Sequence, residues 1–216
     1  MEDKKQQLEE ISRQVTTCQK CPLYKNTTNP VPGEGNPEAE IMFIGEGPGF
    51  NEDQQGRPFV GQAGKLLDIL LADIKIERSD VFIANVVKHR PPENREPLPE
   101  EMGVCQDYLD RQIEIIRPKM IVTLGRFSMM KFIPDGKISQ IHGLARNVEF
   151  KGRKIMILPM FHPAAALRGN EVMQKLKADF FKIPILLKGE EKVVEVISEV
   201  RIKETPKAED PQLTLL

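Results

Sequence analysis

The chain has 216 residues, of which 40% are hydrophobic and 29% are charged, and its formal net charge is -1 at pH 7. This length and composition favour one substantial globular domain, and the near-neutral charge excludes nucleic-acid binding that relies on overall positive charge. Six of the first ten residues are charged, and no apolar run is long enough to span a bilayer. Neither an export signal nor a membrane span is therefore predicted, and we expect a cytoplasmic protein.

Apolar residues at helical spacing predict a short amphipathic helix over residues 2–15, at Leu8, Ile11 and Val15. Cys18 and Cys21 follow this helix in a C-x-x-C motif, and Cys105 is the third cysteine of the chain. This pattern is typical of metal or redox chemistry in a reducing compartment rather than of a disulfide framework. Residues 23–37 are rich in proline and glycine, so we expect an irregular segment there.

The next segment, residues 41–64, reads IMFIGEGPGFNEDQQGRPFVGQAG. It predicts a buried strand over residues 40–45 that ends in a glycine-rich loop, with the acidic Glu46 and Glu52 in the loop and the aromatic Phe59 after it. The loop lacks the Gly-Lys-Ser/Thr of a mononucleotide P-loop, and no G-x-G-x-x-G is present. Both common nucleotide-binding motifs are therefore excluded.

Strand and helix patterns alternate along the rest of the chain. We expect helices at residues 64–74, 100–116, 125–130 and 171–181, and strands at residues 80–87, 119–124 and 154–160. Crossovers of this length favour a parallel sheet with helices on both faces, which is an α/β fold. Because the carboxyl ends of parallel strands share one edge, four residues are predicted to converge there: Glu46, Asn85, Gly125 and His162.

The composition changes near the end of the chain. Residues 189–216 are rich in lysine and glutamate and lack aromatic residues, which indicates a flexible charged tail after one domain over residues 1–188. The apolar residues within 193–202 predict an edge strand or a helix inside that tail.

Four segments together resemble the iron-sulfur branch of the uracil-DNA glycosylase superfamily, usually called family 4. They are GEGPGFNED, PFVGQAG, ANVVK and FHPAAALR, and the resemblance covers residues 17–187. It implies a three-layer α/β/α sandwich with a central four-stranded parallel sheet. It also implies a base excision repair enzyme that hydrolyses the N-glycosidic bond of deoxyuridine in single- and double-stranded DNA, releasing uracil and leaving an abasic site.

The family binds a 4Fe-4S cluster with a C-x-x-C and a second, more widely spaced pair of cysteines, of which only Cys105 is present here. His89 stands at the position of the missing cysteine, and imidazole replaces thiolate on one iron of Rieske centres. The resemblance therefore implies a ligand set of Cys18, Cys21, His89 and Cys105. Zinc, which accepts three cysteines and one histidine, is the alternative metal. A further alternative places His89 in a phosphate-facing loop beside an incomplete cluster.

The resemblance also assigns roles at the predicted edge. Phe59 would stack on an extruded uracil, and the amide of Asn85 would pair with uracil O4 and N3–H. His162 matches the family histidine that binds uracil O2, where negative charge develops as the bond breaks. The alternatives are a core position for Phe59 and a strand-end turn for Asn85. His142 lacks such a motif, and we expect it to be solvated or to position other groups.

The group that activates water is left open by the sequence. Gly47 stands where the best-known relatives carry an aspartate, so Glu46, through its carboxylate or its carbonyl, or Glu52 is expected to hold the water. Alternatively, Glu52 crowds C5 of the base and excludes thymine, or both acids are solvated turn residues.

Binding of DNA requires phosphate contacts and a residue that fills the space of the extruded base. Arg168, Lys88 and Arg90 are the expected phosphate contacts, and Leu167 or its neighbour Ala166 is the expected wedge. A second function uses the same scaffold: a non-catalytic iron-sulfur domain that binds DNA or senses its state. A binding module would have no need of the uracil pocket, so the pocket residues favour the enzyme.

The end of the chain resembles the bacterial sliding-clamp motif Gln-Leu-x-Leu-Phe, with leucine in place of the final phenylalanine, at Gln212, Leu213, Leu215 and Leu216. This resemblance implies a sliding clamp as a partner. The alternative is that these leucines dock on the parent domain. We otherwise expect a monomer.

Overall fold

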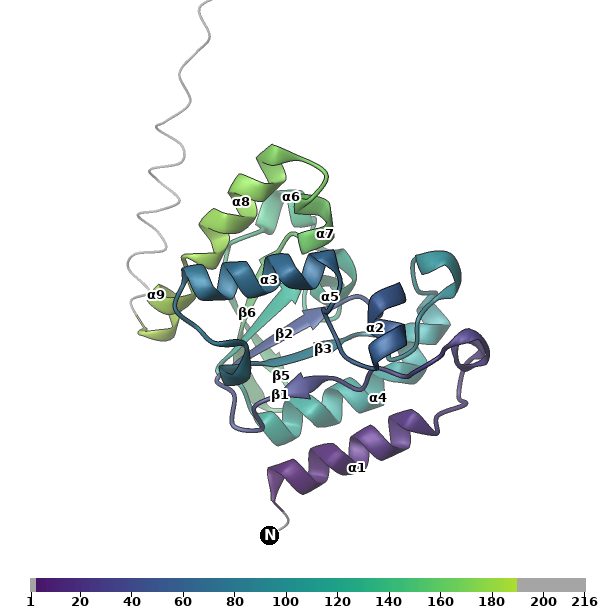
Figure 1. Ribbon diagram of the computed structural model, residues 1–216. Coiled ribbons are helices and arrows are strands. Elements are labelled where there is room, and N and C mark those ends of the chain that lie inside the picture. The colour runs from purple at the N-terminus through teal and green to yellow at the C-terminus, as the bar shows by residue number, and fades with distance from the viewer. Residues whose placement is uncertain (1–2, 190–216) are drawn as a thin grey trace, which may run out of the picture.

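The computed structural model describes residues 3–189 (Figure 1). The strand or helix predicted within residues 193–202 and the clamp motif from Gln212 to Leu216 lie outside the described residues. The domain boundary predicted at residue 188 falls one residue after the last described helix.

A six-stranded sheet with strand order β1-β3-β2-β4-β6-β5 runs through the described part of the chain. Its four inner strands are parallel, as the sequence predicts: β3 (Phe82–Asn85), β2 (Ile41–Gly45), β4 (Met120–Leu124) and β6 (Arg153–Met160). Its edge strands pair antiparallel and are not expected from the sequence: β1 (Glu34–Gly35) and β5 (Arg146–Phe150). Both edge strands are largely accessible to solvent, so they lack the apolar run that identifies the inner strands.

Helices connect the strands and cover both faces of the sheet (Figure 1). The longer helices are α1 (Lys4–Thr16), α3 (Gln62–Asp73), α4 (Pro99–Ile116) and α8 (Asn170–Phe180). The short ones are α2 (Phe50–Gln55), α5 (Arg126–Met130), α6 (Ile138–Ile141), α7 (Pro163–Ala166) and α9 (Ile183–Leu187), with 3-10 turns at Pro22–Asn26, Arg78–Asp80 and Pro92–Asn94. The five helices expected from the sequence correspond to α1, α3, α4, α5 and α8. No helix between residues 3 and 189 has the length and apolar character needed to cross a membrane.

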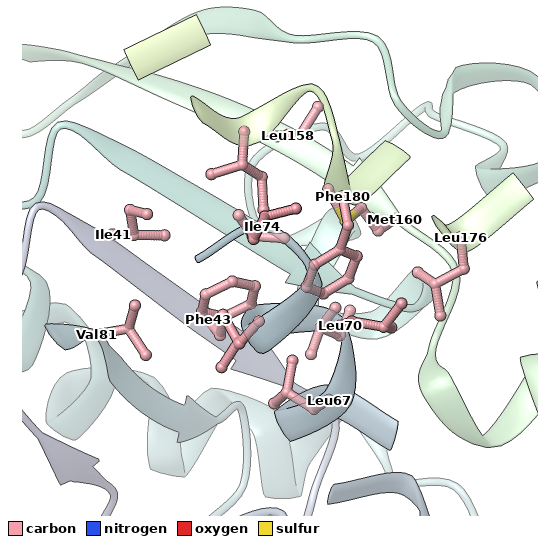
Figure 2. Close-up of a cluster of buried hydrophobic side chains, with 14 of the residues drawn as sticks. Ile41, Phe43, Leu67, Leu70, Ile74, Val81, Leu158, Met160, Leu176 and Phe180 are labelled. Atoms are coloured by element: carbon pink, nitrogen blue, oxygen red, sulfur yellow. The ribbon is translucent and has the colours of Figure 1, made fainter. Parts of the chain in front are cut away.

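The alternation of side chains along β2 divides the core into two layers. Ile41 and Phe43 belong to a cluster with α3, α8 and α9, whereas Met42 and Ile44 belong to a cluster with α4. Figure 2 shows the first cluster, in which the rings of Phe43 and Phe180 stack with centroids 5.9 Å apart. Each fully buried aromatic or leucine side chain contributes about 1.5–3 kcal/mol, so both layers hold the sheet in place. The predicted three-layer α/β/α sandwich is confirmed.

Helix α1 lies outside α4 and adds a further layer on that side (Figure 1). Ile11 and Val15, two of the predicted apolar positions, pack on Tyr108 of α4. The chain then runs through the C-x-x-C motif to the 3-10 turn at Pro22–Asn26, where Leu23 enters the core beside α4. This irregular segment therefore fixes α1 to the main domain.

The strand register brings the carboxyl ends of the inner strands together. Gly45 pairs with Asn85, and Leu124 pairs with Met160. The loops that follow these residues leave the sheet at one edge, as the sequence predicts.

Candidate active site at the carboxyl edge of the sheet

A pocket of about 300 Å³ opens at this edge. All six residues predicted for base binding or chemistry line it: Glu46, Gly47, Glu52, Phe59, Asn85 and His162. The volume lies at the lower end of the range for small-molecule sites, which suits a ligand the size of one nucleobase.

Gly45 lets Phe59 and Asn85 lie side by side in this pocket. A Cβ at Gly45 would be 2.4 Å from Asn85 Oδ1 and 2.7 Å from the ring of Phe59, so a larger residue would displace both. Phe59 itself has a φ of 51°, a left-handed conformation that side chains other than glycine seldom adopt. Arg78 stabilises it by donating to the Phe59 carbonyl at 3.3 Å. The backbone therefore fixes the direction of the ring.

The amide of Asn85 has an acceptor that the fold leaves without a partner. Asn85 is only 2% exposed, and within residues 3–189 no group donates a hydrogen bond to its Oδ1 atom. A buried acceptor without a partner costs about 1–3 kcal/mol. A ligand that donates an N–H at this position would remove that cost.

The proton of the neutral His162 ring is assigned by a backbone contact. Ala164 N–H donates to His162 Nδ1 at 3.1 Å, so Nδ1 is the acceptor and Nε2 carries the hydrogen. Burial lowers the pKa of His162 to about 4, and Arg168 adds to this lowering while Glu52 opposes it. At neutral pH the ring is therefore uncharged with one donor, and it lies 5.6 Å from the Phe59 ring, centroid to centroid.

Glu52 braces the glycine-rich loop. Its carboxylate accepts hydrogen bonds from the backbone N–H groups of Gly49 at 3.1 Å, Val60 at 2.9 Å and Gly61 at 2.8 Å. These bonds occupy both oxygens and join the loop after β2 to the segment that carries Phe59. The structure thus gives Glu52 a bracing role, so Glu52 is not a solvated turn residue.

Glu46 is the acidic side chain of the pocket that remains available. Its carboxylate has no hydrogen-bond partner in the described part of the chain, and burial raises its pKa, with Glu96 adding to the rise and Arg126 opposing it. Its carbonyl already accepts the N–H of Val87 at 3.1 Å. A Cβ on the adjacent Gly47 would lie 2.7 Å from Val87 Cγ2, so a side chain there would require Val87 to shift.

Lys88 was predicted to contact a DNA phosphate, and the structure contradicts this because the side chain is buried. Its side chain is 0% exposed, and its Nζ atom donates to the Asn85 carbonyl at 3.0 Å and to Gln112 Oε1 at 2.8 Å. Gln112 in turn donates to the Pro32 carbonyl at 2.8 Å. Burial lowers the pKa of Lys88 to about 7. Lys88 therefore anchors the end of β3, the strand that carries Asn85.

The other predicted DNA contacts lie at the mouth of the pocket. Arg168 is exposed and lines the pocket, and Arg90 is partly exposed beside the pocket residue Pro91. Leu167 is 46% exposed after α7, whereas its neighbour Ala166 is buried at 3%. Leu167 is thus available as a wedge, and Ala166 is not.

The three cysteines gather where α1, the C-x-x-C motif and α4 meet. Burial raises the pKa of both Cys21 and Cys105, and the charge of Cys18 adds to both rises. Cys18 also forms a hydrogen bond with Tyr108. Buried thiols of this kind become thiolates when a positively charged metal group compensates them.

His89 is adjacent to this group through the backbone. The N–H of Lys88, the preceding residue, bonds to the Cys105 thiol. His89 is 2% exposed, and its Nδ1 atom has no hydrogen-bond partner among residues 3–189. Burial lowers its pKa, and Asp53 opposes that change. In the described chain no three histidine, cysteine, aspartate or glutamate side chains converge as a single metal ion requires.

A buried charged group beneath the His162 loop could not be found from the sequence. His142 is 8% exposed, its Nδ1 lies 2.6 Å from Asp179 Oδ2, and Lys182 Nζ donates to the other Asp179 oxygen at 2.9 Å. The ring of His142 also lies 4.6 Å from that of Phe161, centroid to centroid. His142 is therefore buried rather than solvated. Its partners are far away in the sequence, which is why no local motif reveals them.

Comparison with known proteins agrees with this geometry. Residues 32–183 match the family model of the uracil DNA glycosylase superfamily. This match spans more than half of the chain, and the chain belongs to that superfamily.

Several type-4 proteins of the superfamily are similar to this chain over most of its length. It is 50% identical to the type-4 uracil-DNA glycosylase of Sulfurisphaera tokodaii over 182 residues, which cover 82% of this chain and 83% of the relative. It is 48% identical to the protein of the same name from Archaeoglobus fulgidus, over 82% of this chain and 91% of the relative. It is 45% identical to the type-4 protein of Thermotoga maritima, over 85% of this chain and 96% of the relative. The family predicted from the sequence motifs is confirmed.

Proposed function

We propose that this protein is a uracil-DNA glycosylase that removes uracil from DNA in base excision repair, releasing the free base and leaving an abasic site. One observation carries the proposal: a single pocket combines the unpartnered amide oxygen of Asn85 with the neutral imidazole donor of His162. The family and the identity to type-4 uracil-DNA glycosylases support the same activity.

Recognition of the base follows from the pocket walls. The deoxyuridine must leave the DNA stack to reach the pocket, where the ring of Phe59 offers a flat apolar face. Asn85 Oδ1 accepts uracil N3–H, and its amide nitrogen donates to O4. Cytosine reverses this pattern of donor and acceptor, so it would leave buried polar groups unpaired.

Cleavage of the glycosidic bond leaves negative charge on the departing uracil. His162 Nε2–H, whose orientation is set by the bond from Ala164, donates to uracil O2 and stabilises that charge as it forms. Because the ring is uncharged, it does so as a hydrogen-bond donor without transferring a proton. The electron pair of the glycosidic bond leaves with uracil, and water adds to C1′ of the sugar and gives its proton to the carboxylate of Glu46, which the fold leaves available.

DNA reaches this pocket across a mouth that carries positive charge. Arg168 and Arg90 bind phosphates there, and Leu167 fills the space of the extruded base. Single- and double-stranded DNA are both substrates, and extrusion costs less in a strand whose base is already unpaired.

We further propose that Cys18, Cys21, His89 and Cys105 bind a 4Fe-4S cluster. The gathered cysteines and the unpartnered Nδ1 of the buried His89 support this ligand set. Cys18, Cys21, His89 and Cys105 would hold the cluster, which would cross-link the C-x-x-C motif after α1 to the loop after β3 and to α4.

A uracil-release assay tests the activity. Wild-type protein should excise uracil from single- and double-stranded oligonucleotides, and Asn85→Asp should lose discrimination against cytosine because one amide donor becomes an acceptor. Ile69→Ala, an exposed apolar residue on α3, is the matched control and should retain full activity. Tight DNA binding without release of uracil would favour the non-catalytic DNA-binding or sensing domain instead.

Metal analysis tests the cluster. Protein purified without oxygen should be brown and contain iron and acid-labile sulfide, and His89→Ala should lower its iron content. His89→Cys, which restores the ligand type of the family, should retain iron. Colourless protein with one zinc per chain would overturn the cluster and support the alternative metal.

The C-terminal motif has a separate test. We propose that Gln212, Leu213, Leu215 and Leu216 bind a sliding clamp and raise the local concentration of the enzyme on newly copied DNA. Deleting residues 212–216 should abolish co-elution with a bacterial clamp and leave excision from short oligonucleotides intact. Equal clamp binding by the full-length and the truncated protein would refute this role. Light scattering of the free full-length protein, which measures its molar mass, tests whether it is a monomer.

A further inference from the structure

Phe50 is an exposed aromatic residue at the mouth of the pocket to which the mechanism above gives no role. It is the first residue of α2 and directly follows Gly49, which lines the pocket. Its side chain is 56% exposed. Phe181, at the end of α8 that leads to α9, is similarly exposed at 52% but belongs to a different part of the molecule (Figure 1).

Arg90 lies over the ring of Phe50. Its guanidinium carbon is 5.2 Å from the ring centroid, and its Nε atom donates to Asn94 Oδ1 at 2.8 Å. No carboxylate pairs with Arg90 within the described residues. Arg95, which lines the pocket, pairs with Glu101, and Arg126 pairs with Glu96.

Stability of the fold does not explain this pair. The loops that carry the two residues are already held by other hydrogen bonds, including Val87 N–H to the Glu46 carbonyl at 3.1 Å and Gly49 N–H to the Glu52 carboxylate at 3.1 Å. An exposed cation–π contact adds little to such a framework. The pair instead leaves an aromatic ring that is 56% exposed and a positive charge without a carboxylate partner beside the pocket.

We propose that Phe50 and Arg90 form a second nucleobase subsite. The ring of Phe50 stacks on the base next to the extruded deoxyuridine, and Arg90 binds the phosphate between the two nucleotides. Stacking on aromatic side chains together with contacts from arginine is how proteins bind unpaired bases of a single strand. This subsite rests on the proposed function, because it needs a DNA strand whose deoxyuridine occupies the pocket.

The subsite has a consequence for substrate choice. In a duplex the neighbouring base stays paired and stacked within the helix, so it is not available to Phe50. In a single strand it is free to leave its neighbour and stack on the ring. Phe50 should therefore strengthen binding of single-stranded DNA more than binding of duplex DNA.

The test measures binding of single-stranded oligonucleotides that carry one 2′-fluoro-2′-deoxyuridine, an analogue that resists hydrolysis. Two probes are compared, one with normal bases beside the analogue and one with abasic residues there. Wild-type protein should bind the normal probe about tenfold more tightly, on the scale of one stacked base. Phe50→Ala should bind both probes alike, Phe50→Trp should restore the preference, and Phe181→Ala should behave as wild type.

Salt dependence tests the second half of the subsite. Arg90→Gln should reduce the slope of log affinity against log salt by about one phosphate contact. The subsite is wrong if Phe50→Ala retains the full preference for the normal probe, or if Arg90→Gln leaves the slope unchanged. Either result would leave the proposed function standing as long as wild-type protein releases uracil, whereas absence of uracil release would contradict the function itself.

Discussion

The imidazole of His162 shows how one backbone contact fixes chemistry at the scale of a residue. The N–H of Ala164 makes Nδ1 an acceptor, and burial lowers the pKa of the ring to about 4, so the ring is uncharged at neutral pH. A charged ring would donate from both nitrogens and would lose the bond from Ala164. The family motif HPAAALR identifies this histidine in the sequence, but its protonation state follows only from the fold.

We expect the contribution of His162 to be independent of pH between 5 and 8. His162→Ala should slow single-turnover excision by about 100- to 1000-fold, the usual effect of removing one such donor. Because the folded pKa of His162 lies near 4, its ring stays neutral throughout this range, and the ratio of wild-type to mutant rates should be constant. Taking the ratio removes the titration of Glu46, which both proteins share. An inflection of the ratio near pH 6.5 would show that the ring titrates normally.

The two acids of the loop should respond differently to the same substitution. Glu52→Gln replaces an oxygen that accepts backbone N–H groups, so it should lower stability by about 1.5–3 kcal/mol in chemical denaturation. Glu46→Gln should leave stability nearly unchanged and slow excision by about tenfold or more. For the wild-type protein, the rate should fall as pH decreases through the raised pKa of Glu46, because the base becomes protonated, and Glu46→Gln should remove that fall. If Glu52→Gln instead slows excision without affecting stability, the roles assigned to the two acids are reversed.

At the scale of elements, the end of β3 depends on a lysine that sequence reasoning places at the surface. Lysine side chains are almost never fully buried unless paired, so KHRPP reads as a DNA-facing loop. The structure instead buries Lys88 between the Asn85 carbonyl and Gln112 of α4. The buried hydrogen bonds continue to the Pro32 carbonyl and so tie the strand end to the irregular segment before β2.

Lys88→Met should disturb recognition as well as stability. The substitution leaves the Asn85 carbonyl and Gln112 Oε1 without a buried donor, at a cost of about 1–3 kcal/mol each. Because Asn85 moves with that carbonyl, the KM for uracil-containing DNA should rise and discrimination against cytosine should weaken. Lys65→Met on α3, where the lysine is exposed, is the control and should match wild type. A loss of stability with unchanged discrimination would limit Lys88 to a structural role.

The predictable elements share one property, which is a strong local pattern. The inner strands are apolar runs, and α3 and α4 have clear helical spacing, so these strands and helices can be predicted from the sequence. Strand β1 has two residues, and β5 alternates exposed and partly buried side chains, so neither has a distinct signal. The pairing of Lys88 with Gln112 and of His142 with Asp179 arises from contacts between distant segments. No local sequence pattern reveals these contacts.

At the scale of the whole molecule, α1 is joined to the domain by apolar packing, by polar contacts such as Arg111 to Gln14 at 2.7 Å, and by the proposed metal ligands. Ile11 and Val15 pack on Tyr108 of α4, which is a small apolar contact. The proposed metal ligands Cys18 and Cys21 follow α1, and Cys105 lies on α4 one turn before Tyr108. The core layer that faces α3 contains no residue of this junction, whereas the layer that faces α4 includes Cys21 and Cys105.

Removal of iron should therefore release the N-terminal segment before the sheet. In iron-depleted protein, we expect hydrogen exchange to rise in residues 4–31 and to stay slow in β2 and β4, because the thiols lose their cross-link while the core layers remain packed. Thr16→Ala, an exposed substitution beside the C-x-x-C motif, should retain both iron and protection. Equal loss of protection in β2 and β4 would show that the junction supports the whole domain. Unchanged exchange in residues 4–31 would show that the apolar contact with Tyr108 suffices without the metal.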